Sequence, residues 1–187
     1  MGNAGAARSR LIEIVRERSF STGSETKLVS GRSTNFYFNM KPSMLDPEGG
    51  ALIAKLMLDA LPPGEIDLVG GLEMGAVPLV VAVAVSSQAM GRPLRAVFVR
   101  KQAKDHGARQ LIEGLAPGES VRGKRIAVLE DVTTTGGSAM KAIEALKAEG
   151  AAIARVISLV DRLEGAADAF KRAGIPFTAL LTAADFL

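Results

Sequence analysis

The stretch that decides the fold is Ile-Ala-Val-Leu-Glu-Asp-Val-Thr-Thr-Thr-Gly-Gly-Ser, at residues 126–138. Its first four residues are apolar on both faces of an extended chain, which is typical of a buried strand in a parallel sheet. Two carboxylates, Glu130 and Asp131, follow that run. The carboxyl ends of parallel strands open onto the ligand crevice of an α/β sheet, so we expect both carboxylates there.

The loop after the carboxylates has the composition of a phosphate site. Thr133 to Ser138 offers successive backbone N–H groups and hydroxyls just before a helix N-terminus. The carboxylates can accept hydrogen bonds from vicinal sugar hydroxyls, so the stretch predicts a ribose 5-phosphate site. It contains neither Gly-x-Gly-x-x-Gly nor a Gly-Lys-Ser/Thr ending, unlike dinucleotide-binding folds and P-loops. The alternative is an ordinary strand–turn–helix unit capped by Asp131.

From residue 66 onward, predicted strands alternate with predicted helices. This pattern predicts an α/β fold: a mostly parallel central sheet with right-handed crossovers and helices on both faces. Residues 1–45 break the rhythm and read as a small N-terminal hood over the strand ends, so we expect one domain of hood (1–45) and α/β core (46–187). The expected strands are 27–29, 36–38, 66–69, 95–99, 125–129, 153–160 and 177–181, and the expected helices are 8–18, 46–61, 77–90, 137–149 and one within 161–173.

The composition limits the class of protein. The chain has 187 residues, of which 48% are hydrophobic and 23% charged, as in ordinary globular domains. It has no cysteine, which excludes disulfides and is compatible with a cytoplasmic location. The longest apolar run, 76–85, is too short to span a bilayer, so we expect no membrane association. Few aromatic residues are present for base stacking, which argues against nucleic-acid binding.

A second candidate site is the basic run at residues 100–107, Arg-Lys-Gln-Ala-Lys-Asp-His-Gly. It follows a predicted strand and contains the only histidine of the chain. Such cations can neutralise an anionic leaving group as it departs. A solvated surface loop is the alternative, because most charge runs are of that kind. Residues 100–118 are long and polar, and we expect most of them to form a mobile loop that can close over a substrate.

Residues 126–138 resemble the phosphoribosyl diphosphate motif of the type I phosphoribosyltransferases. The basic run resembles, more narrowly, the catalytic loop of the orotate phosphoribosyltransferase family, which reaches across a dimer interface into the partner's site. The resemblance implies catalytic roles for Lys104, His106 and Asp131. It also implies a binding set for phosphoribosyl diphosphate: Lys27, Arg100, Lys101, Lys104, His106, Glu130, Asp131, Val132, Thr133, Thr134, Thr135, Gly136, Gly137 and Ser138.

Further segments resemble the same family in the same order. Lys27 to Arg32 and Phe36 to Asn39 resemble its N-terminal segment, and Gly70 to Gly75 resembles its diphosphate loop. The orotate ligands implied are Tyr37, Phe38, Thr134 and Arg162, with Arg162 on the carboxylate. Phe36 can instead be a half-buried strand residue, and Asp161–Arg162 can instead be a surface ion pair.

The resemblance implies transfer of the phosphoribosyl group from 5-phospho-α-D-ribose 1-diphosphate to orotate, a step of pyrimidine (UMP) biosynthesis. It implies the type I phosphoribosyltransferase fold, a homodimer with shared active sites, and Mg²⁺ held chiefly by substrate oxygens rather than by protein ligands. A phosphoribosyltransferase for another base is the first alternative, although a purine enzyme has no need of a carboxylate-binding arginine. A non-catalytic, nucleic-acid-binding regulator is the second, although residues 1–20 are too few for a winged-helix module.

Overall fold

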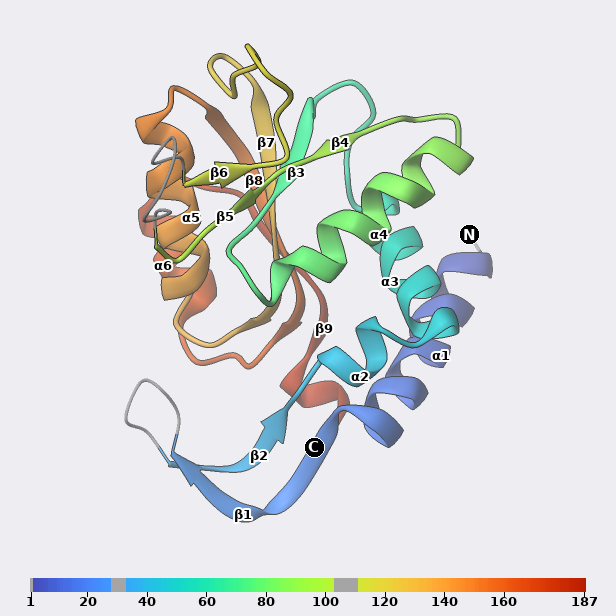
Figure 1. Ribbon diagram of the computed structural model, residues 1–187. Coiled ribbons are helices and arrows are strands. Elements are labelled where there is room, and N and C mark those ends of the chain that lie inside the picture. The colour runs from blue at the N-terminus through green and yellow to red at the C-terminus, as the bar shows by residue number, and fades with distance from the viewer. Residues whose placement is uncertain (1, 28–32, 103–110) are drawn as a thin grey trace.

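The central sheet is parallel throughout, with the strand order β4–β3–β7–β8–β9 (Figure 1). The computed structural model describes residues 2–27, 33–102 and 111–187. Within them the sheet strands are β3 (Leu68–Gly70), β4 (Arg95–Ala96), β7 (Arg125–Thr133), β8 (Ala152–Asp161) and β9 (Phe177–Thr182). The predicted α/β class with a mostly parallel sheet is therefore confirmed.

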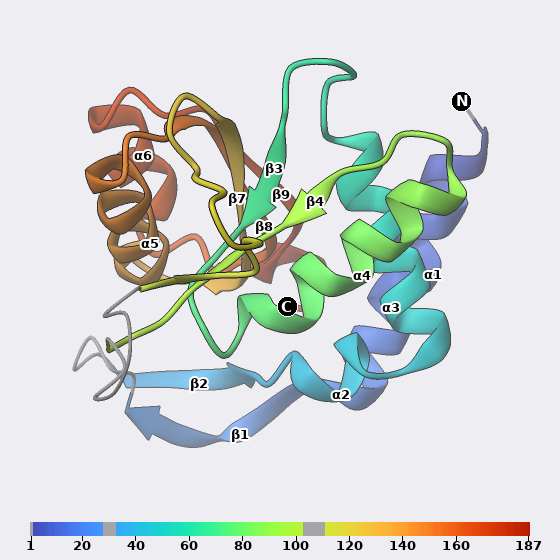
Figure 2. The same ribbon diagram turned by 45° about the horizontal axis from the view of Figure 1, so that its top comes forward.

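Strand β7 lies at the centre of the sheet and separates two apolar cores. Ile126 and Val128 face helices α5 (Gly137–Ala148) and α6 (Ala166–Arg172). Ala127 and Leu129 face the opposite core, built with α1 (Gly2–Arg18), α3 (Pro47–Asp59) and α4 (Ala76–Ala89). All four strand residues are fully buried, which explains why the run is apolar on both faces. Figures 1 and 2 show the helices on both sides of the sheet, as predicted.

The N-terminal part forms an antiparallel hairpin of β1 (Phe20–Lys27) and β2 (Ser33–Phe38), followed by α2 (Lys41–Met44). An aromatic cluster joins this hairpin to the C-terminal end, where the turn η1 spans Ala183–Asp185. In that cluster the ring centroid of Phe38 lies 5.1 Å from those of both Phe20 and Phe186. The hairpin is thereby held near the carboxyl ends of the sheet strands (Figure 1).

Several element boundaries differ from the predictions, because α1 begins at Gly2, β2 begins at Ser33 and β3 spans Leu68–Gly70. Three further differences concern strands near the site and the hairpin. The strand expected at 125–129 continues to Thr133, because it keeps pairing with β8 up to Asp161, so Glu130 and Asp131 are strand residues. The strand expected at 95–99 is divided, and its second part, β5 (Phe98–Val99), pairs with β6 (Ile112–Glu113) inside the expected loop. Strand β1 covers Phe20–Lys27, whereas the strand expected at 27–29 lies, except for Lys27, outside the described residues. The sequence did not indicate β1, because its polar residues show no apolar alternation.

One local prediction is confirmed. Asp46 caps helix α3, and its Oδ1 accepts a hydrogen bond from the Gly49 N–H at 2.9 Å, with Pro47 at the first helical position. Among the residues that the structure describes, no helix has the length and apolar character needed to cross a membrane.

Candidate active site

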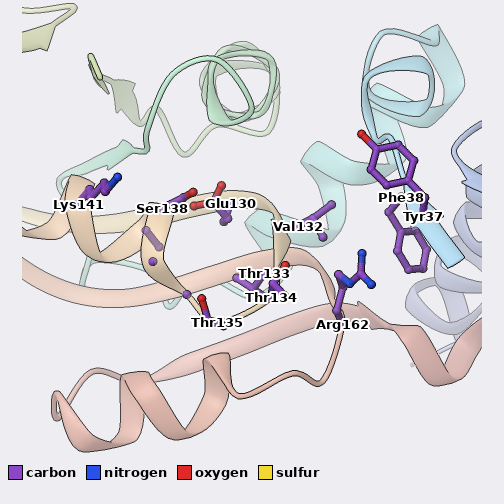
Figure 3. A pocket seen from close by; sticks show the side chains of 13 residues that line it. Tyr37, Phe38, Glu130, Val132, Thr133, Thr134, Thr135, Ser138, Lys141 and Arg162 are labelled. Carbon is purple, nitrogen blue, oxygen red and sulfur yellow. The ribbon is translucent and has the colours of Figure 1, made fainter. Parts of the chain in front are cut away.

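A cavity of about 430 Å³ opens at the carboxyl ends of β7 and β8. Its lining residues come from the hairpin, from the end of β7 with the following loop, from α5 and from the end of β8: Tyr37, Phe38, Glu130, Val132, Thr133, Thr134, Thr135, Gly136, Gly137, Ser138, Ala139, Lys141 and Arg162. In Figure 3, Ser138 and Lys141 lie at one end, and Tyr37, Phe38 and Arg162 lie at the other. Most of the predicted binding residues therefore share one cavity.

The loop after β7 brings the N-terminus of α5 to this cavity. The turn depends on Gly136, whose φ of +83° is strained for other residues, and a Cβ there would lie 3.0 Å from the Phe170 ring. Helix α5 then begins at Gly137, and Gly137, Ser138 and Ala139 all line the cavity. The first N–H groups of a helix lack intrahelical acceptors, so this end can bind an anion.

The side chain of Thr133 is committed to the protein interior. It is 1% exposed, its hydroxyl donates to Asp161 Oδ1 at 3.0 Å, and it lies 3.1 Å from Ser158 Oγ. The Thr133 carbonyl accepts the Arg162 N–H at 2.9 Å. Thr133 thus connects the loop after β7 to the end of β8, and Thr134 and Thr135 line the cavity.

The two adjacent carboxylates of β7 differ in environment. Glu130 is 4% exposed, and its Oε2 has no hydrogen-bond partner among the described residues. Burial, followed by the neighbouring Asp131 carboxylate, raises the pKa of Glu130 well above its ordinary value. Asp131 is half-buried, and its Oδ1 accepts the Val132 N–H at 2.9 Å. The alternative in which Asp131 caps the following helix is wrong, because the N-cap of α5 is Gly136, with no side-chain cap hydrogen bond, and Asp131 lies in β7.

A second cavity, of about 200 Å³, shares Glu130 and Ser138 with the first. Asp131 and Lys101 also line it, as do Lys41 and the residues Leu72 to Gly75 that follow β3. Glu73 is fixed there, because its Oε1 accepts the Lys101 N–H at 2.8 Å. The loop that resembled a diphosphate loop is therefore adjacent to the carboxylate pair.

Arg162 is a buried arginine at the end of β8, only 4% exposed. Its Nε donates to Glu164 Oε1 at 2.8 Å, and its guanidinium carbon lies 4.6 Å from the centroid of the Phe36 ring. Asp161 is equally buried and accepts the Thr133 hydroxyl. The alternative of an exposed Asp161–Arg162 surface pair is therefore wrong.

The aromatic residues of β2 divide between its two faces, as neighbours on a strand must. Tyr37 is 46% exposed, whereas Phe38 is buried in the aromatic cluster, and both line the larger cavity. Phe36 is half-buried, as expected for a strand residue without a binding role, and its ring also packs against the Arg162 guanidinium.

Some predicted residues are not brought to the cavities. The Arg100 guanidinium points to Glu113, with 3.6 Å between Nη1 and Oε1, and lines neither cavity. Lys27 is the last residue of β1, and its side chain is not among those that the structure describes. Lys104 and His106 lie outside the described residues.

Two lysines at the cavities were missed from the sequence. Lys141 lines the larger cavity, and its spacing of three residues from Ser138 on α5 could have indicated a shared helix face. Lys41 lines the smaller one at the start of α2, a helix too short to be recognised from its periodicity.

Comparisons with known proteins show which family this chain resembles. The model of the phosphoribosyl transferase domain family matches residues 43–173. The orotate phosphoribosyltransferase of Rhodopseudomonas palustris (strain BisB5) is 56% identical over 97% of both chains, and that of Bradyrhizobium diazoefficiens is 55% identical over the same shares. The crystal structure of Mycobacterium tuberculosis orotate phosphoribosyltransferase with 5-phospho-α-D-ribosyl 1-diphosphate has a TM-score of 0.78 at 35% identity, covering 96% of this chain and 98% of that one.

Proposed function

The chain belongs to the orotate phosphoribosyltransferase family, and on that premise we propose which of its residues bind the two substrates and assist the reaction. Enzymes of the family are pentosyltransferases that join orotate to phosphoribosyl diphosphate, giving orotidine 5′-phosphate and diphosphate. The observation that best supports the assignments is the cavity, which has an anion-binding helix end on one side and a buried arginine on the other.

The 5′-phosphate end is the loop Thr134 to Ser138. Its backbone N–H groups and hydroxyls precede α5, where the helix dipole favours negative charge. Lys141 lines the same end and adds a positive charge that the sequence motif does not include. Thr133 supports this loop through Asp161 and Ser158.

The ribose lies against the carboxylates of Glu130 and Asp131. Each can accept hydrogen bonds from the vicinal hydroxyls, and the unsatisfied Oε2 of Glu130 would gain a donor when sugar binds. Asp131 faces the smaller cavity, where the reacting sugar carbon and the diphosphate would meet. We therefore assign Asp131 the role of orienting the sugar at the reacting carbon.

The orotate end is formed by Arg162, Thr134, Tyr37 and Phe38, which line the larger cavity. A planar guanidinium suits a carboxylate, and the contacts with Glu164 and Phe36 hold that of Arg162 in place. Tyr37 and Phe38 extend from the hairpin. We also propose that residues 1–45 form a hood and residues 46–187 an α/β core. A hood of this kind would cover the flat base.

The diphosphate end is the smaller cavity, with Lys41 and Lys101. Among the residues that the structure describes, no three or more His, Cys, Asp or Glu side chains are grouped to hold a metal ion. Enzymes of the family generally use Mg²⁺, and the carboxylates of Glu130 and Asp131 are the groups at this cavity that would hold it. When bound, it would neutralise charge on the diphosphate.

In the reaction orotate N1, which attacks as an anion after its proton has passed to solvent, forms a bond with C1 of the ribose, and the bond from C1 to the diphosphate oxygen breaks. Positive charge develops at C1 and negative charge on the departing diphosphate. The protein aligns the two substrates and supplies fixed charges for both changes, which needs no covalent intermediate on a side chain.

Lys27, Lys104 and His106 are the remaining residues that we propose to contact the diphosphate, with Lys104 the main loop catalyst. Arg100 is left out of this set, because its guanidinium lies beside Glu113. In a homodimer, the loop that carries Lys104 and His106 would act in the partner's site. Lys104→Ala should lower kcat far more than it weakens phosphoribosyl diphosphate binding, and mixing it with an Arg162→Ala variant should restore activity in mixed dimers. Near-normal kcat in Lys104→Ala would remove that role. We also propose a cytoplasmic location, with which the absence of cysteine is compatible.

The experiment that tests the activity is an orotate-depletion assay followed by ultraviolet absorbance. Orotate should disappear only when phosphoribosyl diphosphate and Mg²⁺ are both present, and adenine or hypoxanthine should not replace it. Use of a purine instead would favour the alternative substrate class.

A further inference from the structure

We propose that Gly75 is a positioning residue for Asp131, because its missing side chain leaves the space that the Asp131 carboxyl group occupies. The inference rests on the proposed role of Asp131 at the sugar. Gly75 caps α4 on the loop after β3, whereas Asp131 lies in β7, and both line the smaller cavity. The contact therefore joins two separate segments of the site.

The geometry of this contact is unusually close. A Cβ on residue 75 would lie 2.6 Å from Asp131 Oδ1 and 2.7 Å from both Cγ and Oδ2. These distances are well inside van der Waals contact, so the two groups could not coexist. The backbone of Gly75 has φ of −59° and ψ of −42°, which any residue adopts readily. Asp131, rather than the backbone conformation, is thus the reason for glycine here.

Asp131 has no easy way to make room. Rotation about the Cβ–Cγ bond moves its two oxygens but leaves Cγ in place, and Cγ itself is in the contact. Relief would need a change of χ1, a movement of the loop at residue 75, or a shift of β7, which pairs with β8 on both sides of Asp131, at Glu130 and Val132. A change of χ1 would also break the hydrogen bond from the Val132 N–H at 2.9 Å. An alanine at 75 should therefore turn the carboxylate away from the sugar.

Gly71, in the same loop, provides a contrast. A Cβ there would lie 2.4 Å from the Leu129 carbonyl oxygen and from the Ala76 Cβ, so that glycine is required by the packing of the chain itself. Gly75 meets a functional side chain instead. Substitution at 71 should damage folding, and substitution at 75 should damage the use of phosphoribosyl diphosphate.

The test is a double-mutant cycle with Gly75→Ala and Asp131→Ala, and Gly5→Ala in α1, where a Cβ meets nothing within 4 Å, is the control. Gly75→Ala should lower kcat/KM for phosphoribosyl diphosphate by at least about 10-fold, change KM for orotate little and keep Tm near that of the wild type. In the Asp131→Ala background the same change should cost less than about 2-fold, because the group it displaces is gone.

Independent losses that multiply in the double variant would overturn the proposal, as would normal kinetics in Gly75→Ala. Unchanged kinetics in Asp131→Ala would overturn the proposed sugar role of Asp131 itself, and with it the inference. If Gly75→Ala does not fold, Gly75→Ala combined with Asp131→Gly decides. Recovery of a cooperative thermal transition supports the contact, and continued failure to fold contradicts it.

Discussion

The two ends of strands β3 and β7 carry opposite electrostatic arrangements. At the amino end, Asp67, just before β3, accepts hydrogen bonds from Arg125 of β7 through Nη2 at 2.8 Å and the backbone N–H at 2.7 Å. At the carboxyl end, Glu130 and Asp131 are adjacent carboxylates, and the residues Leu72 to Gly75 that follow β3 lie beside them. One end is a completed ion pair, whereas the other places two carboxyl groups side by side at a cavity that Lys41 and Lys101 also line.

The pKa shifts express this contrast. Hydrogen bonds from the Arg125 side chain and backbone lower the pKa of Asp67 to about 2. Burial, reinforced by Asp131, raises the pKa of Glu130. The first group contributes to folding, while the second is poorly satisfied until a ligand supplies donors. The ion pair at the amino end therefore contributes to the fold, whereas the carboxyl groups at the other end fit the proposed role in substrate binding.

The largest expected effect is that of Asp131→Ala on catalysis. Removing this preorganised group should lower kcat/KM for phosphoribosyl diphosphate by about 100-fold or more, with little change in Tm. Steady-state kinetics with varied phosphoribosyl diphosphate and saturating orotate measure it. A loss under 3-fold would place Asp131 with the structural charges instead.

Arg162→Lys should have the next largest effect, because lysine keeps the charge but loses the planar fork that suits a carboxylate. We expect a fall of roughly 10-fold to 100-fold in kcat/KM for orotate, and a much smaller change for phosphoribosyl diphosphate. Kinetics with each substrate varied in turn separate the two. Equal losses for both substrates would argue that Arg162 only supports the fold.

Glu130→Gln should stabilise the protein in a pH-dependent manner. A carboxyl whose pKa is raised in the folded state opposes folding increasingly as pH rises above its ordinary value of 4.5. The Tm of the variant should therefore exceed that of the wild type by more at pH 8 than at pH 5. Thermal scans across that range test it, and curves that stay parallel would contradict the buried, ionisable state of Glu130.

Asp67→Asn should have the smallest effect, and the opposite pH dependence. Its pKa is lowered from 3.8 to about 2, so its contribution to stability is present above pH 3.8 and is lost as pH falls through about 2. Because the pair is largely exposed, we expect only a few degrees of Tm at pH 7, with convergence toward the wild type in acid, and unchanged kinetics. A lower kcat/KM in this variant would contradict a purely structural role for Asp67.

The sequence predicted the parts of the site that are contiguous in the chain. Apolar periodicity identified β7 and its flanking helices, and residues 130–138 form a single local unit whose chemistry can be recognised from order alone. The sheet, the helices on both faces and the Asp46 cap followed from the same local signals.

The remaining features depend on contacts between distant segments. The burial of Glu130 comes from the continued pairing of β7 with β8, which extends past the apolar run. Strand β6 is too short to have a periodicity, and it exists because β5 offers it a partner. Lys41 lines the same cavity as the two carboxylates only because the chain folds that way, and the Gly75–Asp131 contact joins a loop to a strand that no local sequence pattern connects.

The most direct test of the contrast between the two ends is calorimetric titration of phosphoribosyl diphosphate with Mg²⁺ into the wild type, Asp67→Asn and Asp131→Asn. Each variant removes one negative charge and keeps the side-chain shape, so they differ only in which end of the sheet they change. We predict wild-type Kd for Asp67→Asn and a Kd at least about 10-fold higher for Asp131→Asn. Equal affinity in the two variants would contradict the assignment of the carboxyl end to the substrate.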